Sequence, residues 1–109
     1  MVLSTHDDEA RSTIDSTTGG IMTAEVGAIT GELEVATRSL KGGLIEVAVR
    51  YAGAEEWYIV EGSPVDFGGV GNLTPRELRE LHERVVRHLK TPGKIVDGNE
   101  QATSLLKFS

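Results

Sequence analysis

The segment at residues 74–90, TPRELRELHERVVRHLK, constrains the fold most strongly, because both of its ends are marked in the sequence. Thr74 is a good N-cap, since its hydroxyl can accept a hydrogen bond from a backbone N–H of the first turn. Glu77 completes a capping box with it, and Pro75 falls at the first helical position, where a missing N–H costs nothing. Pro92 follows the segment and ends it. The sequence therefore predicts one helix here.

The predicted helix is amphipathic. At about 100° per residue its apolar side chains form one stripe, which histidines flank. The stripe is Leu78, Leu81, Val85 and Leu89, flanked by His82, Val86 and His88. The other face mixes basic and acidic residues, namely Arg76, Arg79, Arg84, Arg87 and Lys90 with Glu80 and Glu83. A helix of this kind covers an apolar surface with one side and faces water with the other.

Three segments before the helix have the pattern of β-strands. Residues 44–51 (LIEVAVRY) are rich in β-branched side chains, and residues 57–61 (WYIVE) return after a turn at Gly53. Residues 32–39 alternate polar and apolar side chains, and a Lys-Gly-Gly turn at residues 41–43 allows them to pair with the next segment. We therefore expect an α+β fold, a small antiparallel β-meander of three to four strands packed on one amphipathic C-terminal helix.

Composition predicts little order at the N-terminus. Residues 1–19 are rich in Ser, Thr and Asp and contain few apolar side chains. Burial in such a segment cannot offset the entropy that is lost when it becomes ordered. We expect a disordered N-terminal tail over residues 1–19 and a single α+β domain over residues 20–109.

Two segments of that domain leave alternatives open. In residues 21–30 the apolar side chains fit a helical spacing, but Gly27 and Gly31 disfavour a helix and favour extended structure. Residues 94–109 contain an Asp-Gly turn and an apolar end. That end either adds an edge strand to the sheet or docks on the core.

Composition and charge exclude several classes of protein. The 109-residue chain has no cysteine, which excludes disulfides and thiolate metal sites. No apolar run approaches the roughly 18 residues of a membrane span. The N-terminus lacks the basic and apolar regions of a secretory signal, so a cytoplasmic location without membrane contact is expected. The net charge of −6, divided as −7 in residues 1–63 and +1 in residues 64–109, disfavours general nucleic-acid binding.

No catalytic, cofactor-binding or metal-binding residue is predicted. His82 and His88 point in different directions from a helix, so they cannot bind one metal ion together. Each is expected at the edge of the apolar stripe with its polar tip in water. The glycine-rich loop at residues 66–72 precedes the helix but lacks the spacing of phosphate-binding loops. Glu77 would also compete with an anion at that helix end.

The aromatic residues indicate a surface for binding. Trp57 and Tyr58 are adjacent on a predicted strand, so their side chains point to opposite faces of the sheet. If Tyr58 faces the helix, then Trp57 and Ile59 lie on the opposite face with Leu44. An exposed tryptophan and isoleucine on a polar sheet face are typical of a protein interface, unless another segment of the chain covers them.

These patterns lead to three functional hypotheses. The first is a small soluble non-enzymatic binding or regulatory module that acts through a protein–protein interface at Leu44, Trp57 and Ile59. A homodimer is the simplest form of such an interface. The alternative is a nucleic-acid-associated accessory protein that uses the basic face of the helix. That face consists of Arg76, Arg79, Arg84 and Arg87. A small enzyme with the glycine-rich loop as its site ranks last.

Overall fold

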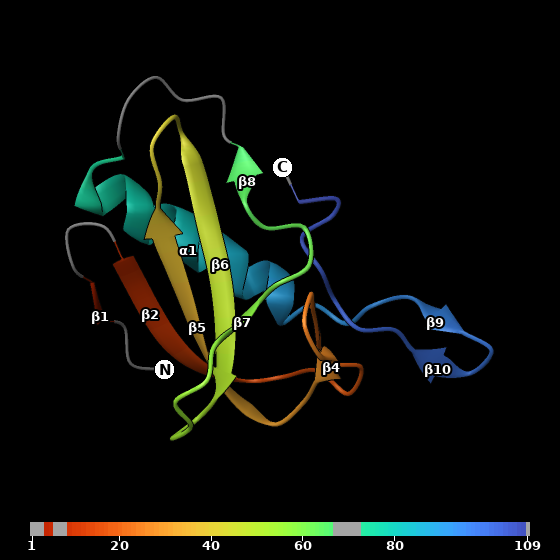
Figure 1. The fold of residues 1–109 in the computed structure, drawn as a ribbon. Helices are drawn as coiled ribbons and strands as arrows, with labels where there is room; N and C mark the ends of the chain where they lie inside the picture. The colour runs from red at the N-terminus through yellow and green to blue at the C-terminus, as the bar shows by residue number, and fades with distance from the viewer. Residues whose placement is uncertain (1–3, 6–8, 67–72, 109) are drawn as a thin grey trace.

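The protein has an α+β fold, an antiparallel sheet of several strands with the C-terminal helix α1 (Pro75–Leu89) across one face (Figure 1). The computed structural model of the chain describes residues 4–5, 9–66 and 73–108. The strands follow the order β1-β2-β5-β6-β7, and β8 also pairs with β6. Their bounds are β1 (Ser4–Thr5), β2 (Glu9–Asp15), β5 (Glu32–Ser39), β6 (Leu44–Tyr51), β7 (Tyr58–Ile59) and β8 (Val65–Asp66).

The predicted meander forms the middle of the sheet. Strands β5 and β6 cover the predicted residues 32–39 and 44–51 and pair antiparallel, with Val35 opposite Val49. The returning strand β7 is shorter than the predicted residues 57–61 but also pairs with β6. The helix and these strands enclose the core between them.

Strand β2 shows that the prediction of a disordered tail is wrong over residues 9–15. It pairs with β5 along its whole length, from Glu9 opposite Arg38 to Asp15 opposite Glu32. Its alternate residues are buried under the helix, although they include an alanine and a serine. An estimate of burial that counts only large apolar side chains overlooks such a strand. The sheet therefore contains more strands than the predicted meander, while residues 1–3 and 6–8 of the predicted tail lie outside the described residues.

The ambiguous segment at residues 21–30 is extended. It forms a small hairpin of β3 (Ile21–Thr23) and β4 (Gly27–Ile29). The Thr23 hydroxyl donates a 2.6 Å hydrogen bond to the Gly27 carbonyl across the turn. Gly27 has a positive φ of 78°, which suits glycine and not a helix interior.

Helix α1 begins as predicted. The Glu77 N–H donates to the Thr74 hydroxyl at 3.1 Å, and the Thr74 N–H donates to the Glu77 carboxylate at 2.9 Å. The hydrogen bond from the Thr74 N–H, together with a smaller effect of the Thr74 hydroxyl, lowers the pKa of the Glu77 carboxyl below its usual value. The face turned to β2 and β5 is buried and contains Leu78, His82, Val85, Val86 and Leu89.

The C-terminal residues form a projecting hairpin and then return to the core. Strands β9 (Ile95–Val96) and β10 (Asn99–Glu100) project away from the sheet and the helix (Figure 1). The predicted turn between them is present, with positive φ values of 51° at Asp97 and 80° at Gly98. Leu105 then packs in the core with 2% of its surface exposed. The end therefore docks on the core and adds no edge strand to the main sheet.

None of the helices in the described ranges is long and apolar enough to cross a membrane.

Candidate functional site on the open face of the sheet

The sheet face opposite to α1, here called the open face, is defined by the register of β2, β5 and β6. Residues that pair across strands lie on the same side of the sheet. Glu9, Arg38 and Glu46 form one row across the three strands, because Glu9 pairs with Arg38 and Arg38 with Glu46. Glu34 and Arg50 form a second row nearer the other end. The open face therefore carries charged side chains at both ends of the strands.

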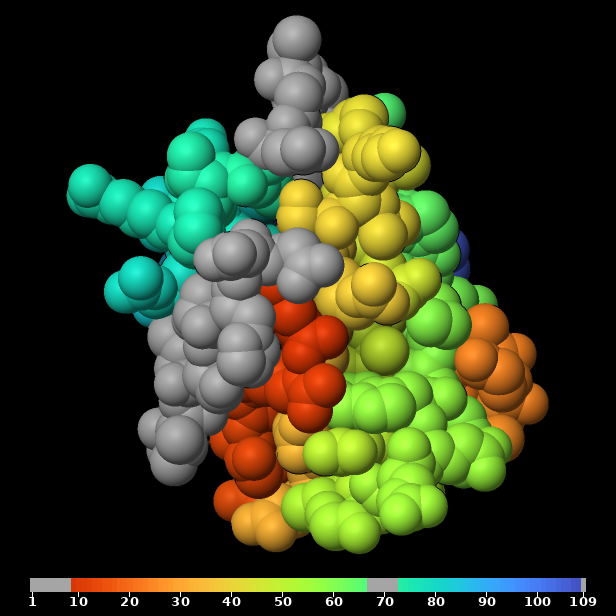
Figure 2. All heavy atoms as spheres, turned by 60° about the vertical axis from the view of Figure 1, so that its left-hand side comes forward, coloured from red at the N-terminus to blue at the C-terminus, as the bar shows by residue number. Residues whose placement is uncertain are grey.

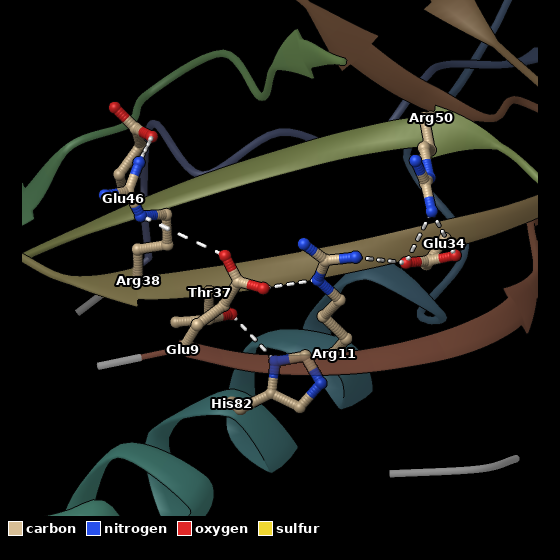
Figure 3. Close-up of polar contacts among 8 residues, drawn as sticks. All are labelled: Glu9, Arg11, Glu34, Thr37, Arg38, Glu46, Arg50 and His82. Carbon is tan, nitrogen blue, oxygen red and sulfur yellow. Dashed lines mark hydrogen bonds and ion pairs between the residues drawn. The ribbon is translucent and has the colours of Figure 1, made fainter. Parts of the chain in front are cut away.

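These charged side chains connect into one charge network, shown in Figure 3. Its members are Glu46, Arg38, Glu9, Arg11, Glu34 and Arg50. Glu9 contacts the Arg11 guanidinium, and Arg11 reaches Glu34 at 3.4 Å. Glu34 also accepts from Nη2 of Arg50 at 3.2 Å through both oxygens. The hydrogen bond that the Arg11 guanidinium donates to Glu9 raises the pKa of Arg11 above its usual value, and the charge of Glu9 adds to this against the opposing effect of burial.

Among the described residues the network alternates in sign, and its charges sum to zero. Its three arginines and three glutamates follow one another in the order of their contacts. Arg38 makes the longest contacts of the network, at 4.0 Å from Glu9 and 3.9 Å from Glu46. The close contacts therefore run from Glu9 through Arg11 to Glu34 and Arg50, and two arginines share the Glu34 carboxylate.

Trp57 lies against two arginines of this network. The Cζ atom of Arg50 is 4.4 Å from the centre of the indole ring, and that of Arg11 is 5.2 Å away. Each such cation–π contact contributes about 0.5–1 kcal/mol at an exposed site. Within the described residues, the Nε–H of Arg50 is buried and has no hydrogen-bond acceptor. The indole is therefore held in place on the open face, although β7 begins only at the next residue.

The structure places the three predicted interface residues on the open face. Ile59 pairs with Ala48, and Leu44 belongs to the same alternate set of β6 as Glu46 and Ala48. All three are half-buried, so the expected exposed tryptophan and isoleucine are only partly accessible. Figure 2 shows atoms of residues around 50–60 (green) at the surface beside β2 (red). The three residues flank the charge network instead of forming one apolar patch.

The four arginines of the alternative nucleic-acid site all lie on the exposed side of α1. Arg76 contacts Glu80 at 3.4 Å, and Arg84 lies 5.6 Å from the ring centre of Phe108. Glu80 and Glu83 occupy the same exposed side. The structure therefore groups the arginines as the sequence indicates, but glutamates interrupt their positive charge.

A buried polar cluster of Ser12, Thr37 and His82 lies on the other face, and sequence reasoning did not predict it. Nε2 of His82 is 2.6 Å from the Ser12 hydroxyl, and Nδ1 is 2.8 Å from the Thr37 hydroxyl (Figure 3 shows the second contact). All three side chains are at most 1% exposed. The expectation that His82 has its polar tip in water is therefore wrong. His88 is half-buried, and its Nε2 lies 2.7 Å from the Ser104 carbonyl.

Burial keeps His82 neutral. It lowers the pKa of His82 from 6.5 to about 4, because the charged form would lose its hydration. In a neutral imidazole one ring nitrogen donates and the other accepts, so one hydroxyl accepts and the other donates. The contact between serine and histidine resembles a nucleophile and its base, but a substrate has no access to it at this burial. We therefore assign the buried polar cluster a structural role.

The remaining chemical possibilities have little support in the described residues. No group of three or more His, Asp or Glu side chains in the described ranges could hold a metal ion. Residues 67–72 of the glycine-rich loop lie outside the described residues, so the prediction for this loop stays a prediction. Ser63, near that loop, accepts a 2.9 Å hydrogen bond from the Val47 N–H.

Comparisons with protein-family models, with curated proteins and with solved structures give no match for this chain.

Proposed function

We propose that the protein is a small, non-enzymatic binding module whose open face binds a protein partner. The observation that carries this proposal is the position of Trp57, half-buried on the open face and held between Arg11 and Arg50. Tryptophan and arginine are the residue types most enriched among the side chains that dominate binding energy at protein interfaces.

The charge network supports this proposal by fixing the arginines before a partner arrives. Glu9 and Glu34 hold Arg11 and Arg50 beside the indole, so little side-chain entropy is lost on binding. The buried Nε–H of Arg50 lacks an acceptor in the described residues, and a partner carbonyl that reaches it beside the indole would satisfy this donor. Because the network is neutral as a whole, the best partner surface is polar and aromatic and not strongly charged.

Trp57 is the only tryptophan of the chain, so its fluorescence reports directly on the open face. The partner can be a second copy or another protein. If it is a second copy, the emission of Trp57 and its quenching by acrylamide should change as the protein is diluted from roughly 1 mM to 1 μM, across the usual range of weak affinities.

A matched pair of variants tests the proposal for any partner. Trp57→Ala removes the anchor, and Arg79→Ala removes an exposed helix residue of the alternative site. Immobilised wild-type protein and the Arg79→Ala variant should retain the same proteins from an extract, and Trp57→Ala should lose them. Retention of the same proteins by all three, with no change in Trp57 fluorescence on dilution, would sink the proposal.

The alternative is a nucleic-acid accessory role, and the exposure of Arg76, Arg79, Arg84 and Arg87 on one helix is the observation in its favour. Binding through phosphates is strongest at low salt. Labelled DNA and RNA whose anisotropy stays unchanged at about 20 mM salt would eliminate this alternative.

A further inference from the structure

The projecting hairpin of β9 and β10, here called the arm, carries apolar side chains on its surface. Ile95 is 65% exposed and Val96 is 47% exposed. Neighbouring residues of a strand point to opposite sides, so the arm presents an apolar side chain on each of its two faces. The arm is thus the place where the described chain exposes adjacent large aliphatic residues.

A two-stranded hairpin of this length is at best marginally stable in water without further packing. The two ends of the arm are joined by a 2.8 Å hydrogen bond from the Gln101 N–H to the Lys94 carbonyl, and the Gly19 N–H of the body donates a 2.5 Å hydrogen bond to the Glu100 carboxylate. These bonds orient the arm but leave its two apolar residues in solvent. An additional surface that covers Ile95 and Val96 would stabilise it.

A hollow of about 370 Å³ lies at the base of the arm. It is formed by the chain just before and just after the hairpin together with the end of α1. Its lining is His88, Thr91, Pro92, Gly93, Lys94, Thr103, Ser104, Leu106 and Lys107. Leu106 is 66% exposed there. The hollow therefore combines an exposed leucine with two lysines and contains no acidic residue.

The arm and the hollow are complementary in charge as well as in apolar character. Residues 95–100 contain Asp97 and Glu100 and no basic residue, while the hollow contains Lys94 and Lys107. An arm cannot fold back into the hollow at its own base. A second copy, related by a two-fold axis, can place its arm alongside in the opposite direction, so that each Asp97 tip meets the lysines at the other base.

We infer that the arm is a dimerisation element and that its occupant is the hollow of a second copy of this chain. The contact is reciprocal, since each copy supplies one arm and one hollow. The contact between one arm of about seven residues and one hollow buries a small area, at the low end of the range found in protein interfaces. The dimer is therefore in exchange with monomer. This inference goes beyond the proposed function, because the arm and the open face are different surfaces.

Cysteine cross-linking tests the contact directly, because the chain contains no cysteine of its own. Two differently tagged full-length variants, Val96→Cys and Leu106→Cys, are mixed and oxidised. A disulfide needs Cα atoms within roughly 7 Å, so the mixed product should form rapidly if the arm occupies the hollow. The matched control is Val26→Cys, since Val26 is 53% exposed but lies in the β3–β4 turn. Equal cross-linking of Leu106→Cys with either partner would overturn the inference.

Sedimentation of the wild-type chain and of arm variants gives the second measurement. Ile95→Ser should raise the dimer dissociation constant at least about ten-fold, because it removes apolar area from the contact. Asp97→Asn should raise it about three-fold, and this effect should be smaller in a Lys107→Gln background, which removes one of the two lysines that Asp97 meets. Asparagine suits the positive φ of this position.

Two outcomes of the sedimentation experiment overturn the inference. One is a wild-type chain that stays strictly monomeric up to about 1 mM, beyond which any contact is too weak to matter. The other is a dimer that Ile95→Ser leaves intact and Trp57→Ala abolishes, which would assign self-association to the open face. A dimer lost in Ile95→Ser but kept in Trp57→Ala supports the arm, and the proposed function is then judged by its own retention experiment.

Discussion

Strands β2 and β5 carry two polar groups that lie on opposite faces of the same sheet. Under the helix, the buried polar cluster of Ser12, Thr37 and His82 is neutral and at most 1% exposed. On the open face, the charge network contains six ionised side chains, and its arginine side chains are 22–50% exposed. Arg11 and Ser12 are consecutive residues, yet each belongs to a different group. The access of water to each face, and not the position along the chain, decides whether that face carries neutral or charged polar side chains.

This difference sets how much each interaction matters for stability. A buried hydroxyl or imidazole that loses its partner stays unsatisfied, which costs about 1–3 kcal/mol per group. The carboxylates of the charge network are 17–33% exposed, so one that loses its arginine is still partly hydrated, and we expect such ion pairs to contribute about 1 kcal/mol or less. We therefore expect substitutions in the buried polar cluster to be far more destabilising than substitutions in the charge network.

The largest effect is expected for His82→Ala. The substitution leaves a cavity and also removes the partner of both Ser12 and Thr37. We expect the free energy of unfolding to fall by roughly 3–5 kcal/mol. Urea denaturation followed by circular dichroism measures this change. Arg79→Ala, on the exposed side of the same helix, serves as control and should cost less than about 0.5 kcal/mol. A loss below about 1 kcal/mol for His82→Ala would remove the contrast between the two faces.

Acid should weaken the protein through the same histidine. The pKa of His82 is about 4 when folded and about 6.5 when unfolded. Since the folded pKa is the lower one, the stabilisation is complete above about pH 6.5 and is lost as the pH falls to 4, to a total of about 3 kcal/mol. Unfolding measured at several pH values should show this loss in wild type and a smaller one in His82→Gln. An NMR titration of His82 with a midpoint near 6.5 would contradict the prediction.

The buried polar cluster also explains why the sequence predicted some strands and missed β2. Strands β5 and β6 present Val35, Val47 and Val49 to the core, and β-branched alternation is readable without knowing the partner. In β2 the corresponding position is Ser12, which can be buried only because His82 supplies a hydrogen bond from 70 positions further along the chain. A local pattern does not contain that information.

The candidate site was predictable to a similar extent. Alternation along the two predicted strands placed Leu44, Trp57 and Ile59 on one face. The register shows this for Leu44 and Ile59, and the contacts of Trp57 with Arg11 and Arg50 show it for the indole. The contact of Arg11 with Trp57 was not predictable, because it depends on β2 lying beside β5. The docking of Leu105 in the core was likewise open, since its N–H donates to the distant Glu61 carbonyl and the nearby Thr103 forms a β-bridge with Ile21.

Within the charge network, Glu34→Gln should have the largest effect, because this carboxylate contacts both Arg11 and Arg50. We expect a loss of about 1 kcal/mol at low salt. The loss should shrink at 0.5–1 M salt, where ionic screening acts over only a few ångströms. Urea denaturation at the two salt concentrations measures it. A loss of 3 kcal/mol or more, unaffected by salt, would mean that the network behaves as a buried group and that the two faces do not differ in kind.

The smallest effect is expected at the end of the network, for Glu46→Gln. In the described part of the chain Glu46 has one ion pair, at 3.9 Å from Arg38, whose side chain is 50% exposed. The pair is long and hydrated, so its removal should change the free energy of unfolding by less than about 0.3 kcal/mol. The measurement is made beside Glu34→Gln in the same buffer, since both substitutions replace one carboxylate by an amide. Equal losses for the two would show that the network is cooperative and that Arg38 passes the effect along it. A negligible loss for Glu46→Gln beside a measurable one for Glu34→Gln would show that stability on the open face depends on the number of close partners each carboxylate has.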